Sequence, residues 1–283
     1  MSKDWKTMEL PASPDRPSAS GASEMRLLPP DPRPSFPEGE IVHATTLTTK
    51  PSDSAKVTDA GELFYVLEGE GELWRATGDL EEVVPLRPGC CVSIPAGIEY
   101  QYIARRTPLK FLVATAPRFH ERSWVKGERR YWDEHGNVVP RRSQRPGPSV
   151  PKDAGLGETK NLLRDAAPDY PAPDGSEIRL LPTFKEGGLA HCTLPAGKFS
   201  RPVRHRTVKE VWYVLSGRGR VWRGRADDEE DVVNVVPGTC LTIPTGVSFQ
   251  FRAQDDGPVE IMIGTFPAWP GPNEAEPVEG RWT

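Results

Sequence analysis

The chain has 283 residues, of which 36% are hydrophobic and 27% charged, and its formal net charge is −4. This length can bury one large core or two small ones. The weakly acidic balance lacks the concentrated basic face that nucleic acid requires, and no run reaches the roughly 18 apolar residues of a membrane span. We therefore expect neither nucleic acid nor membrane as a partner. The polar N-terminus lacks the hydrophobic region of a signal peptide, so we expect a cytoplasmic protein.

Residues 1–23 form the first segment and are rich in proline and serine, as in "PASPDRPSASGAS". Such a composition is typical of a mobile tail or of an arm packed on another domain. The stretch "APDYPAPDGS", which ends at Ser176, resembles it and precedes a similar unit. This recurrence favours an ordered arm.

Residues 24–119 contain short β-branched and aromatic runs, such as Phe64–Leu67 and Phe111–Val113, punctuated by glycine and proline. These signals predict antiparallel strands in a sandwich or barrel of about one hundred residues. Residues 120–176 differ in composition. Part of this segment is rich in proline, glycine and arginine, which indicates an inter-domain linker or insertion. Residues 177–270 return to the first pattern, and residues 271–283 are expected to form a C-terminal tail.

Two copies of one unit make up most of the chain. The run "ELFYVLEGEGELWR" from Glu62 returns as "EVWYVLSGRGRVWR" from Glu210, and "IPAGIEYQY" from Ile94 returns as "IPTGVSFQF" from Ile243. Internal repeats of this length indicate two homologous domains. The four cysteines show no CxxC spacing, so we expect reduced structural thiols.

The spacing of glycine, histidine, glutamate and proline resembles the cupin superfamily, in its two-domain bicupin form. In the second unit the two cupin motifs fall on Gly197, Val203, His205, Glu210 and Gly217, then on Gly238, Pro244, Gly246 and Phe249. In the first unit they fall on Val57, Glu62 and Gly69, then on Gly89, Pro95, Gly97 and Tyr100. The resemblance implies an all-β fold of two tandem cupin barrels, which are double-stranded β-helices of the jelly-roll type.

The resemblance implies that a metal, where a cupin binds one, is held by three histidines and one glutamate inside the barrel. The second unit has Val203 and Phe249 in two histidine positions, and an apolar side chain offers a metal no donor atom. We therefore expect no cofactor. A weakly held divalent metal stays open in the second unit, where His191 could join His205 and Glu210 if it faced inward.

The replaced positions predict an aromatic pocket in the second unit. The resemblance directs His205 and Glu210 into the barrel, and strand alternation places Trp212 on the side of Glu210. The ligand-binding residues that we expect are Trp212, Phe249, Phe251, His191 and Val203. In the first unit we expect the rings to pack a degenerate scaffold domain. Gln101 and Gln250 should turn away from the barrel and form hydrogen bonds with a neighbouring segment.

Three functions follow from this site. The first is a bicupin that binds a small organic molecule in the C-terminal barrel and acts as a metal-independent isomerase, epimerase, cyclase or lyase, with Glu210 and His205 as acid/base groups. The second is a non-catalytic ligand-binding bicupin. The third is a metal-dependent dioxygenase or decarboxylase that uses the reduced ligand set with His191. The expected partner is a small-molecule ligand or substrate, and pairing into a homodimer stays open.

Overall fold

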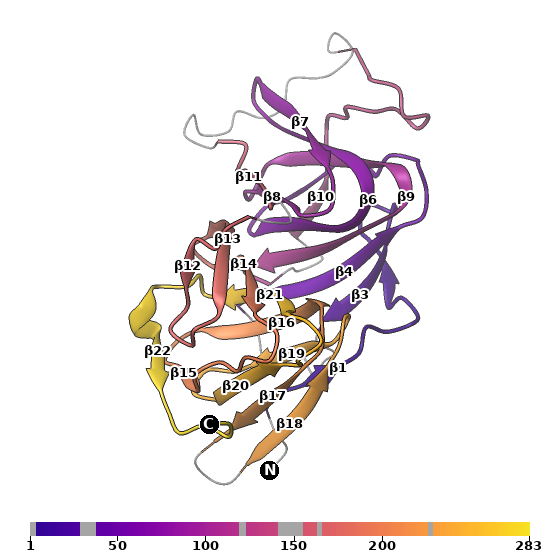
Figure 1. Ribbon diagram of the computed structural model, residues 1–283. Helices are drawn as coiled ribbons and strands as arrows, with labels where there is room; N and C mark the ends of the chain where they lie inside the picture. The colour runs from indigo at the N-terminus through magenta and orange to yellow at the C-terminus, as the bar shows by residue number, and fades with distance from the viewer. Residues whose placement is uncertain (1–3, 29–37, 119–122, 141–154, 163–165, 226–228) are drawn as a thin grey trace. The chain divides into compact units, whose positions relative to one another are not determined.

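The computed structural model describes residues 4–28, 38–118, 123–140, 155–162, 166–225 and 229–283 (Figure 1). It divides into an N-terminal unit of Ala12–Leu27 and Glu40–Arg164, and a C-terminal unit of Met1–Pro11, Leu28–Gly39 and Asp165–Thr283. The described residues form strands and turns without an α-helix, which confirms the all-β prediction. They include no helix of the length and apolarity that a membrane crossing requires.

The N-terminal unit is built on one ten-stranded sheet with the path β11-β8-β6-β9-β4-β3-β2, to which β5, β7 and β10 attach. Its strands are β2 (Arg16–Pro17), β3 (Glu24–Leu28), β4 (Glu40–Thr46), β5 (Ala55–Val57), β6 (Gly61–Thr77), β7 (Leu80–Leu86), β8 (Cys90–Ile94), β9 (Glu99–Ala116), β10 (Trp124–Lys126) and β11 (Thr159–Asn161). The long strands β6 and β9 pair along their lengths, and their register shifts between Val66 and Gly71. Such irregularities let one antiparallel sheet bend around a core.

The C-terminal unit has two sheets, ordered β1-β19-β16-β21-β14-β13-β12 and β18-β17-β20-β15-β22. Its strands are β1 (Thr7–Met8), β12 (Tyr170–Pro171), β13 (Glu177–Phe184), β14 (Gly187–Leu194), β15 (Val203–His205), β16 (Lys209–Ser216), β17 (Gly219–Gly224), β18 (Glu230–Val235), β19 (Cys240–Ile243), β20 (Ser248–Ala253), β21 (Val259–Phe266) and β22 (Ala275–Pro277). Alternate side chains of both sheets, such as Trp212, Ile261, Val221 and Phe251, meet in one core.

The two units repeat the same strand registers. Glu62 of β6 lies opposite Ile94 and Thr115, and Glu210 of β16 lies opposite Ile243 and Thr265. Because register decides which side chains face the core, equivalent sequence positions take equivalent places in the two barrels. The prediction of two tandem cupin barrels is confirmed.

Two short strands, which we call the arm strands, each precede one unit in sequence but pair with the sheet of the other unit. Strand β1 lies ahead of the N-terminal unit but pairs with β19, where Thr7 is opposite Leu241. Strand β11 lies ahead of the C-terminal strands but pairs with β8, where Thr159 is opposite Val92. The units therefore divide the chain differently from the sequence boundaries, because residues 12–27 and 123–162 lie with the N-terminal unit. Most of the arginine-rich part of the expected linker lies outside the described residues.

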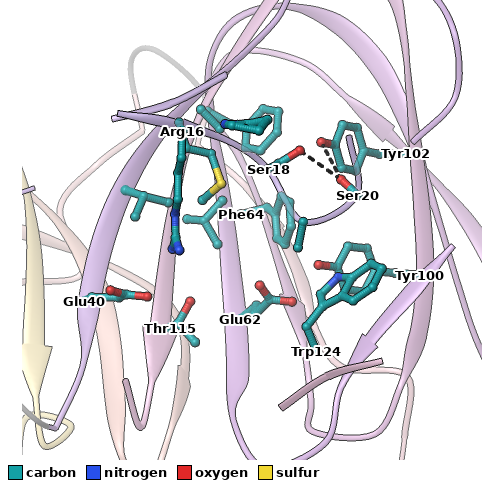
Figure 2. A pocket seen from close by; sticks show the side chains of 17 residues that line it. Arg16, Ser18, Ser20, Glu40, Glu62, Phe64, Tyr100, Tyr102, Thr115 and Trp124 are labelled. Carbon is teal, nitrogen blue, oxygen red and sulfur yellow. Dashed lines mark hydrogen bonds between the residues drawn. The ribbon is translucent and has the colours of Figure 1, made fainter. Parts of the chain in front are cut away.

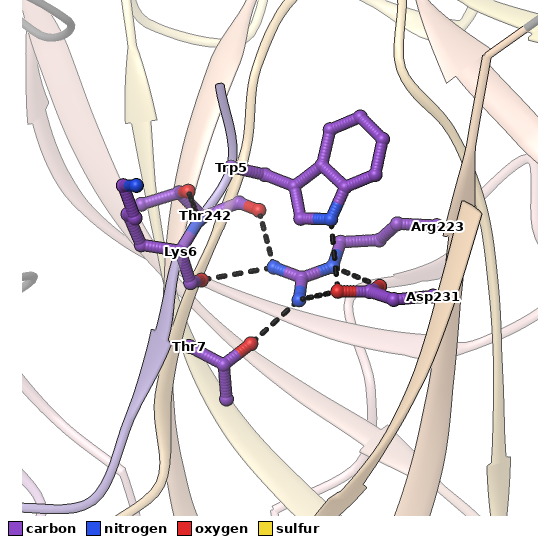
Figure 3. A network of polar contacts seen from close by, with 6 residues as sticks. All are labelled: Trp5, Lys6, Thr7, Arg223, Asp231 and Thr242. Atoms are coloured by element: carbon purple, nitrogen blue, oxygen red, sulfur yellow. Dashed lines mark hydrogen bonds and ion pairs between the residues drawn. The ribbon is translucent and has the colours of Figure 1, made fainter. Parts of the chain in front are cut away.

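A buried arginine holds each of these arm strands. Figure 3 shows Arg223 donating to the Lys6 carbonyl at 2.9 Å and to Thr7 Oγ1 at 2.5 Å. The equivalent Arg75 donates to Thr159 Oγ1 at 3.0 Å. Both arginine side chains are almost fully buried, so the hydrogen bonds to the arms satisfy groups that water does not reach.

A glutamine in each unit holds the segment that follows the barrel. Gln250 Oε1 accepts the backbone N–H groups of Arg281 and Trp282, both at 2.9 Å. Gln101 Oε1 accepts those of Tyr131 and Trp132 at the same distance. Both amides point out of the barrel, as strand alternation predicts. The four cysteines are buried free thiols, and burial raises the pKa of each.

Candidate functional site

The C-terminal barrel contains a cavity of about 210 Å³. Strand β16 contributes two side chains of one face, Glu210 and Trp212, because successive inward residues are two apart. Strand β15 contributes Val203 and His205 by the same rule, and Val203 lies opposite Phe249 of β20. All five of these predicted residues line the cavity.

The other two predicted residues take different places. Phe251 is buried in the core, where its ring centroid lies 5.1 Å from that of Trp212, and it does not line the cavity. His191 lies on β14 between Ala190, which lines the cavity, and Cys192, which belongs to the core. Because neighbouring residues of a strand face opposite sides, His191 faces away from the barrel interior. The structure does not bring it to Glu210.

The polar atoms of the cavity form a short chain of contacts. Trp212 Nε1 donates to Glu210 Oε2 at 2.7 Å, and Glu210 Oε1 lies 3.8 Å from His205 Nδ1. The His205 ring lies edge-on to Phe249 and to Trp269, with centroid distances of 5.0 and 5.1 Å. Among the described residues, His205 Nδ1 has no hydrogen-bond partner. This nitrogen is therefore available to a ligand.

Burial shifts the two titratable groups in opposite directions. Loss of water raises the pKa of Glu210 to about 8, although the hydrogen bond from Trp212 opposes the shift. Loss of water lowers the pKa of His205 to about 4, although the charges of Glu274 and Asp174 oppose it. The 3.8 Å separation is within ion-pair range, yet desolvation exceeds the attraction. At neutral pH the cavity therefore holds a carboxylic acid beside a neutral imidazole.

Asp174 is a second buried acid of this cavity, and sequence reasoning missed it. It precedes β13, lines the cavity, and accepts the N–H and the hydroxyl of Ser176 at 2.9 and 2.7 Å. Burial raises its pKa. The residue falls in the segment expected to be a linker, and its Asp-Gly-Ser turn pattern gave no indication of an inward side chain.

The cavity lacks two of the histidine ligands that the cupin motifs imply for a metal. Val203 and Phe249 have no lone pairs, and Trp212 already occupies one oxygen of Glu210. His205, the other oxygen of Glu210 and the carboxyl group of Asp174 remain, and Asp174 already accepts two hydrogen bonds from Ser176. Protein sites for such metals use three or more ligands. No group of three or more His, Cys, Asp or Glu able to hold a metal ion occurs within the described part of the chain.

The N-terminal barrel contains a larger cavity of about 450 Å³. Figure 2 shows Glu62, Phe64, Tyr100, Tyr102 and Trp124 around it. The sequence predicts that the rings of the first unit pack its core; Phe64, Tyr100 and Tyr102 do belong to a buried core cluster, and they also line this cavity. Burial raises the pKa of Glu62 to about 7, although a hydrogen bond from Tyr100 opposes the shift. Trp124 belongs to the expected linker, so the motif frame gave no sign of it.

A family model described as the cupin domain matches residues 48–115 and 190–264, which together make up half of the chain. The chain is a two-domain cupin. Its two matched regions fall on the two barrels. No curated protein matches the sequence.

Solved structures share the fold of this cupin. Oxalate decarboxylase from Bacillus subtilis at pH 4.6 aligns with a TM-score of 0.68 and 14% identity over 93% of this chain and 76% of the other. The 11S allergen from Cocos nucifera aligns with a TM-score of 0.65 and 15% identity over 92% and 90%. A further structure of the Bacillus subtilis enzyme, studied for its Mn(II) centres, has a TM-score of 0.67 at 14% identity over 93% and 77%. At these identities the likeness establishes the fold alone.

Proposed function

We propose that the C-terminal barrel binds a small organic molecule and catalyses a metal-independent acid/base reaction of the isomerase, epimerase, cyclase or lyase type. The observation that carries this proposal is the pair formed by Glu210 and His205, with 3.8 Å between Oε1 and Nδ1 at the cavity wall. Both groups are buried and shifted toward their neutral forms. A neutral acid beside a neutral base is the state that proton exchange with a ligand requires near neutral pH.

The pair can move protons in both directions within one cycle. His205 Nδ1 takes a proton from an acidic C–H or O–H group of the ligand, while the Glu210 carboxyl group gives its proton to a carbonyl or leaving-group oxygen. The resulting imidazolium and carboxylate lie close enough to stabilise each other in a site of low dielectric constant. Return of a proton from the imidazolium and uptake of one by the carboxylate restore the starting state, so the reaction consumes no net proton.

The cavity limits the ligand in size and polarity. Its volume of about 210 Å³ equals that of about seven water molecules. Its walls include Leu189, Trp212, Phe249 and Ile263, and its polar groups gather at Glu210 and Asp174. We therefore expect a compact molecule with one carbonyl or hydroxyl group on a mainly apolar body.

A non-catalytic ligand-binding cupin is the second candidate. The small cavity and the rings against His205 favour it, because a packed acid/base pair can persist without turnover. The metal-dependent dioxygenase or decarboxylase has less support, because His191 lies on the opposite face of its strand. Cytoplasmic location and pairing into a homodimer stay predictions.

Proton exchange with solvent tests the proposal without knowledge of the product. The protein is incubated in D₂O with a panel of small hydroxyketones, hydroxyaldehydes and 2-hydroxy acids, and NMR detects deuterium at carbon. We expect exchange for at least one compound and a loss of about 10²-fold or more in the Glu210→Gln variant. The Glu62→Gln variant is the matched control in the other barrel and should retain exchange. Exchange that persists in Glu210→Gln, or that requires added metal and stops with a chelator, would contradict the proposal.

A further inference from the structure

The larger cavity of the N-terminal barrel is a second site whose chemistry differs from the first. Its volume is about 450 Å³, which lies within the range of about 300 to 1,000 Å³ that holds organic ligands. All of its lining residues belong to the N-terminal unit. It therefore stands apart from the Glu210 site and from the function proposed for it.

One part of the wall of this cavity is aromatic and aliphatic. The Phe64 ring lies 5.3 Å from that of Phe111 and 5.6 Å from that of Tyr100, measured between centroids. Trp124 lines the cavity beside Tyr100 (Figure 2), and Val42 is part of the same lining. Ring faces and aliphatic groups in this arrangement favour a planar ligand.

One buried acid points into this space with an unused oxygen. Glu62 is only 7% exposed, and Tyr100 donates a hydrogen bond to its carboxyl group. Among the described residues, Glu62 Oε2 has no hydrogen-bond partner. Buried polar atoms without a partner are rare in folded proteins and costly, so each needs an explanation.

The second copy of the domain explains why this oxygen is open. Glu210 occupies the equivalent position, but Trp212 donates to one of its oxygens and His205 lies beside the other. Phe64 replaces the tryptophan, and Val57 replaces the histidine five residues before the glutamate. Neither replacement has a hydrogen to donate. The N-terminal copy has thus lost these two neighbours of its glutamate, receives one hydrogen bond from Tyr100 instead, and has a larger cavity.

On the far side of the cavity, the hydroxyl of Tyr102 already has hydrogen-bond partners. The hydroxyl of Tyr102 forms hydrogen bonds with Ser20 at 3.2 Å and with Ser23 at 2.8 Å. Figure 2 shows this hydroxyl and Ser20 at a distance from Glu62. Arg16, Glu40 and Thr115 also line the cavity (Figure 2), and Glu62 Oε2 is the carboxyl oxygen beside the aromatic rings that has no partner among the described residues.

We propose that the N-terminal cavity binds a planar aromatic alcohol of the phenol class, whose hydroxyl donates to Glu62 Oε2 while its ring lies against the walls formed by Phe64, Tyr100 and Trp124. The hydroxyl takes the place of the Trp212 indole N–H, which donates to the equivalent glutamate of the C-terminal copy. The ring replaces water against the aromatic walls. This assignment does not depend on catalysis in the C-terminal barrel.

Calorimetric titration of the full chain tests the proposal with three probes of one shape. 4-Ethylphenol carries the donor, 4-ethylanisole has a methyl group in its place, and 4-ethylbenzoate carries a second carboxylate. We expect 4-ethylphenol to bind at least tenfold more tightly than either of the others. Equal or tighter binding of the ether or the benzoate overturns the proposal, and so does a failure of 4-ethylphenol to bind at millimolar concentration.

Three variants locate the bound probe. Glu62→Leu removes the acceptor and should weaken 4-ethylphenol binding at least tenfold, and Ala44→Leu, which fills the cavity from β4, should weaken it to a similar extent. Glu210→Leu alters the other barrel and should leave binding unchanged. Loss of binding in Glu210→Leu with retention in Glu62→Leu would overturn the assignment.

Thermal melting separates a ligand site from a structural acid. Since Glu62 is a buried acid with an open oxygen, Glu62→Leu should melt at the same temperature as the wild type or higher, and 4-ethylphenol should raise the melting temperature of the wild type alone. A lower melting temperature for Glu62→Leu, together with no effect of the probe on the wild type, would show that Glu62 serves the fold.

Discussion

Glu210 and His205 show how burial alone can prepare a pair of side chains for proton exchange. In water the glutamate would be charged near neutral pH, with a pKa of 4.5, and in the barrel that pKa is about 8. The histidine moves from 6.5 to about 4. Both shifts have the same first cause, the loss of water around the charged form. The barrel therefore selects the uncharged state of both groups.

This selection makes stability depend on pH. Between pH 4.5 and 8 the folded chain binds the Glu210 proton more tightly than the unfolded chain does, so the free energy of unfolding falls as pH rises. Between about pH 4 and 6.5, His205 makes the free energy of unfolding rise with pH, because the unfolded chain binds its proton more tightly. The decline caused by Glu210 is therefore least opposed above pH 6.5. We expect Glu210→Gln to remove on the order of 1–2 kcal/mol of the decline between pH 6.5 and 8. Urea unfolding at the two pH values measures it.

The control for this prediction is Glu186→Gln, because Glu186 is exposed. It should leave the decline between pH 6.5 and 8 as it is in the wild type. An unchanged decline in Glu210→Gln would mean that the carboxyl group is already charged in the folded state. The acid/base proposal would then lose its proton donor.

The site residues that the sequence predicted correctly lie in or beside the cupin motifs. Glu210, His205, Trp212, Val203 and Phe249 came from motif spacing and strand alternation, and the structure places all of them at one cavity. Those rules describe neighbours along a strand. They cannot tell which distant segment closes the barrel.

The residues that were missed lie in such segments. Asp174 and Trp124 both fall in the part of the chain expected to be a linker, and each enters its cavity through a short strand or turn with little pattern of its own. The expectation that His191 lines the site did not hold, because strand alternation alone does not tell which alternate residues face the barrel interior. One residue of known orientation is needed to decide it. Ala190 and Cys192 fix it in the structure.

The arm strands depend on side chains from the sheets that they join. Strand β1 has only two residues in register with β19, so its own ladder is weak. Arg223 adds hydrogen bonds to Lys6 and Thr7, and Trp5 Nε1 donates to Asp231 at 2.9 Å. These side-chain contacts add to the backbone pairing of the arm. The same design recurs at Arg75.

Replacement of Arg223 should therefore release the arm. We expect Arg223→Leu to lower the free energy of unfolding by about 3–5 kcal/mol, since it breaks a buried ion pair and leaves carbonyl groups without donors. Amide hydrogen exchange should quicken in residues 6–10. Arg220→Leu is the matched control, because Arg220 lies on the same strand and is exposed. Equal effects of the two variants would contradict this account.

At the scale of the molecule, each barrel takes one strand from the segment that leads into the other barrel in sequence. Deletion of residues 1–11 should therefore speed amide exchange in β19, near the end of the chain, and leave β8 protected. Lys160→Pro should do the reverse, because proline in β11 removes a ladder donor and strains the pairing with β8. Exchange measured by mass spectrometry reads both strands at once. Loosening of β8 by the deletion would contradict the pairing.

The position of these arms also bears on how the protein behaves in concentrated solution. Strands β8 and β19 each end a path of paired strands except for the short arm laid beside them. A bare strand edge offers unpaired N–H and C=O groups to any other chain and can start aggregation. A half-molecule cut between the repeats would carry one such bare edge and one spare arm, and so could recruit further copies head to tail. Joining both repeats in one polypeptide keeps that self-association within a single chain.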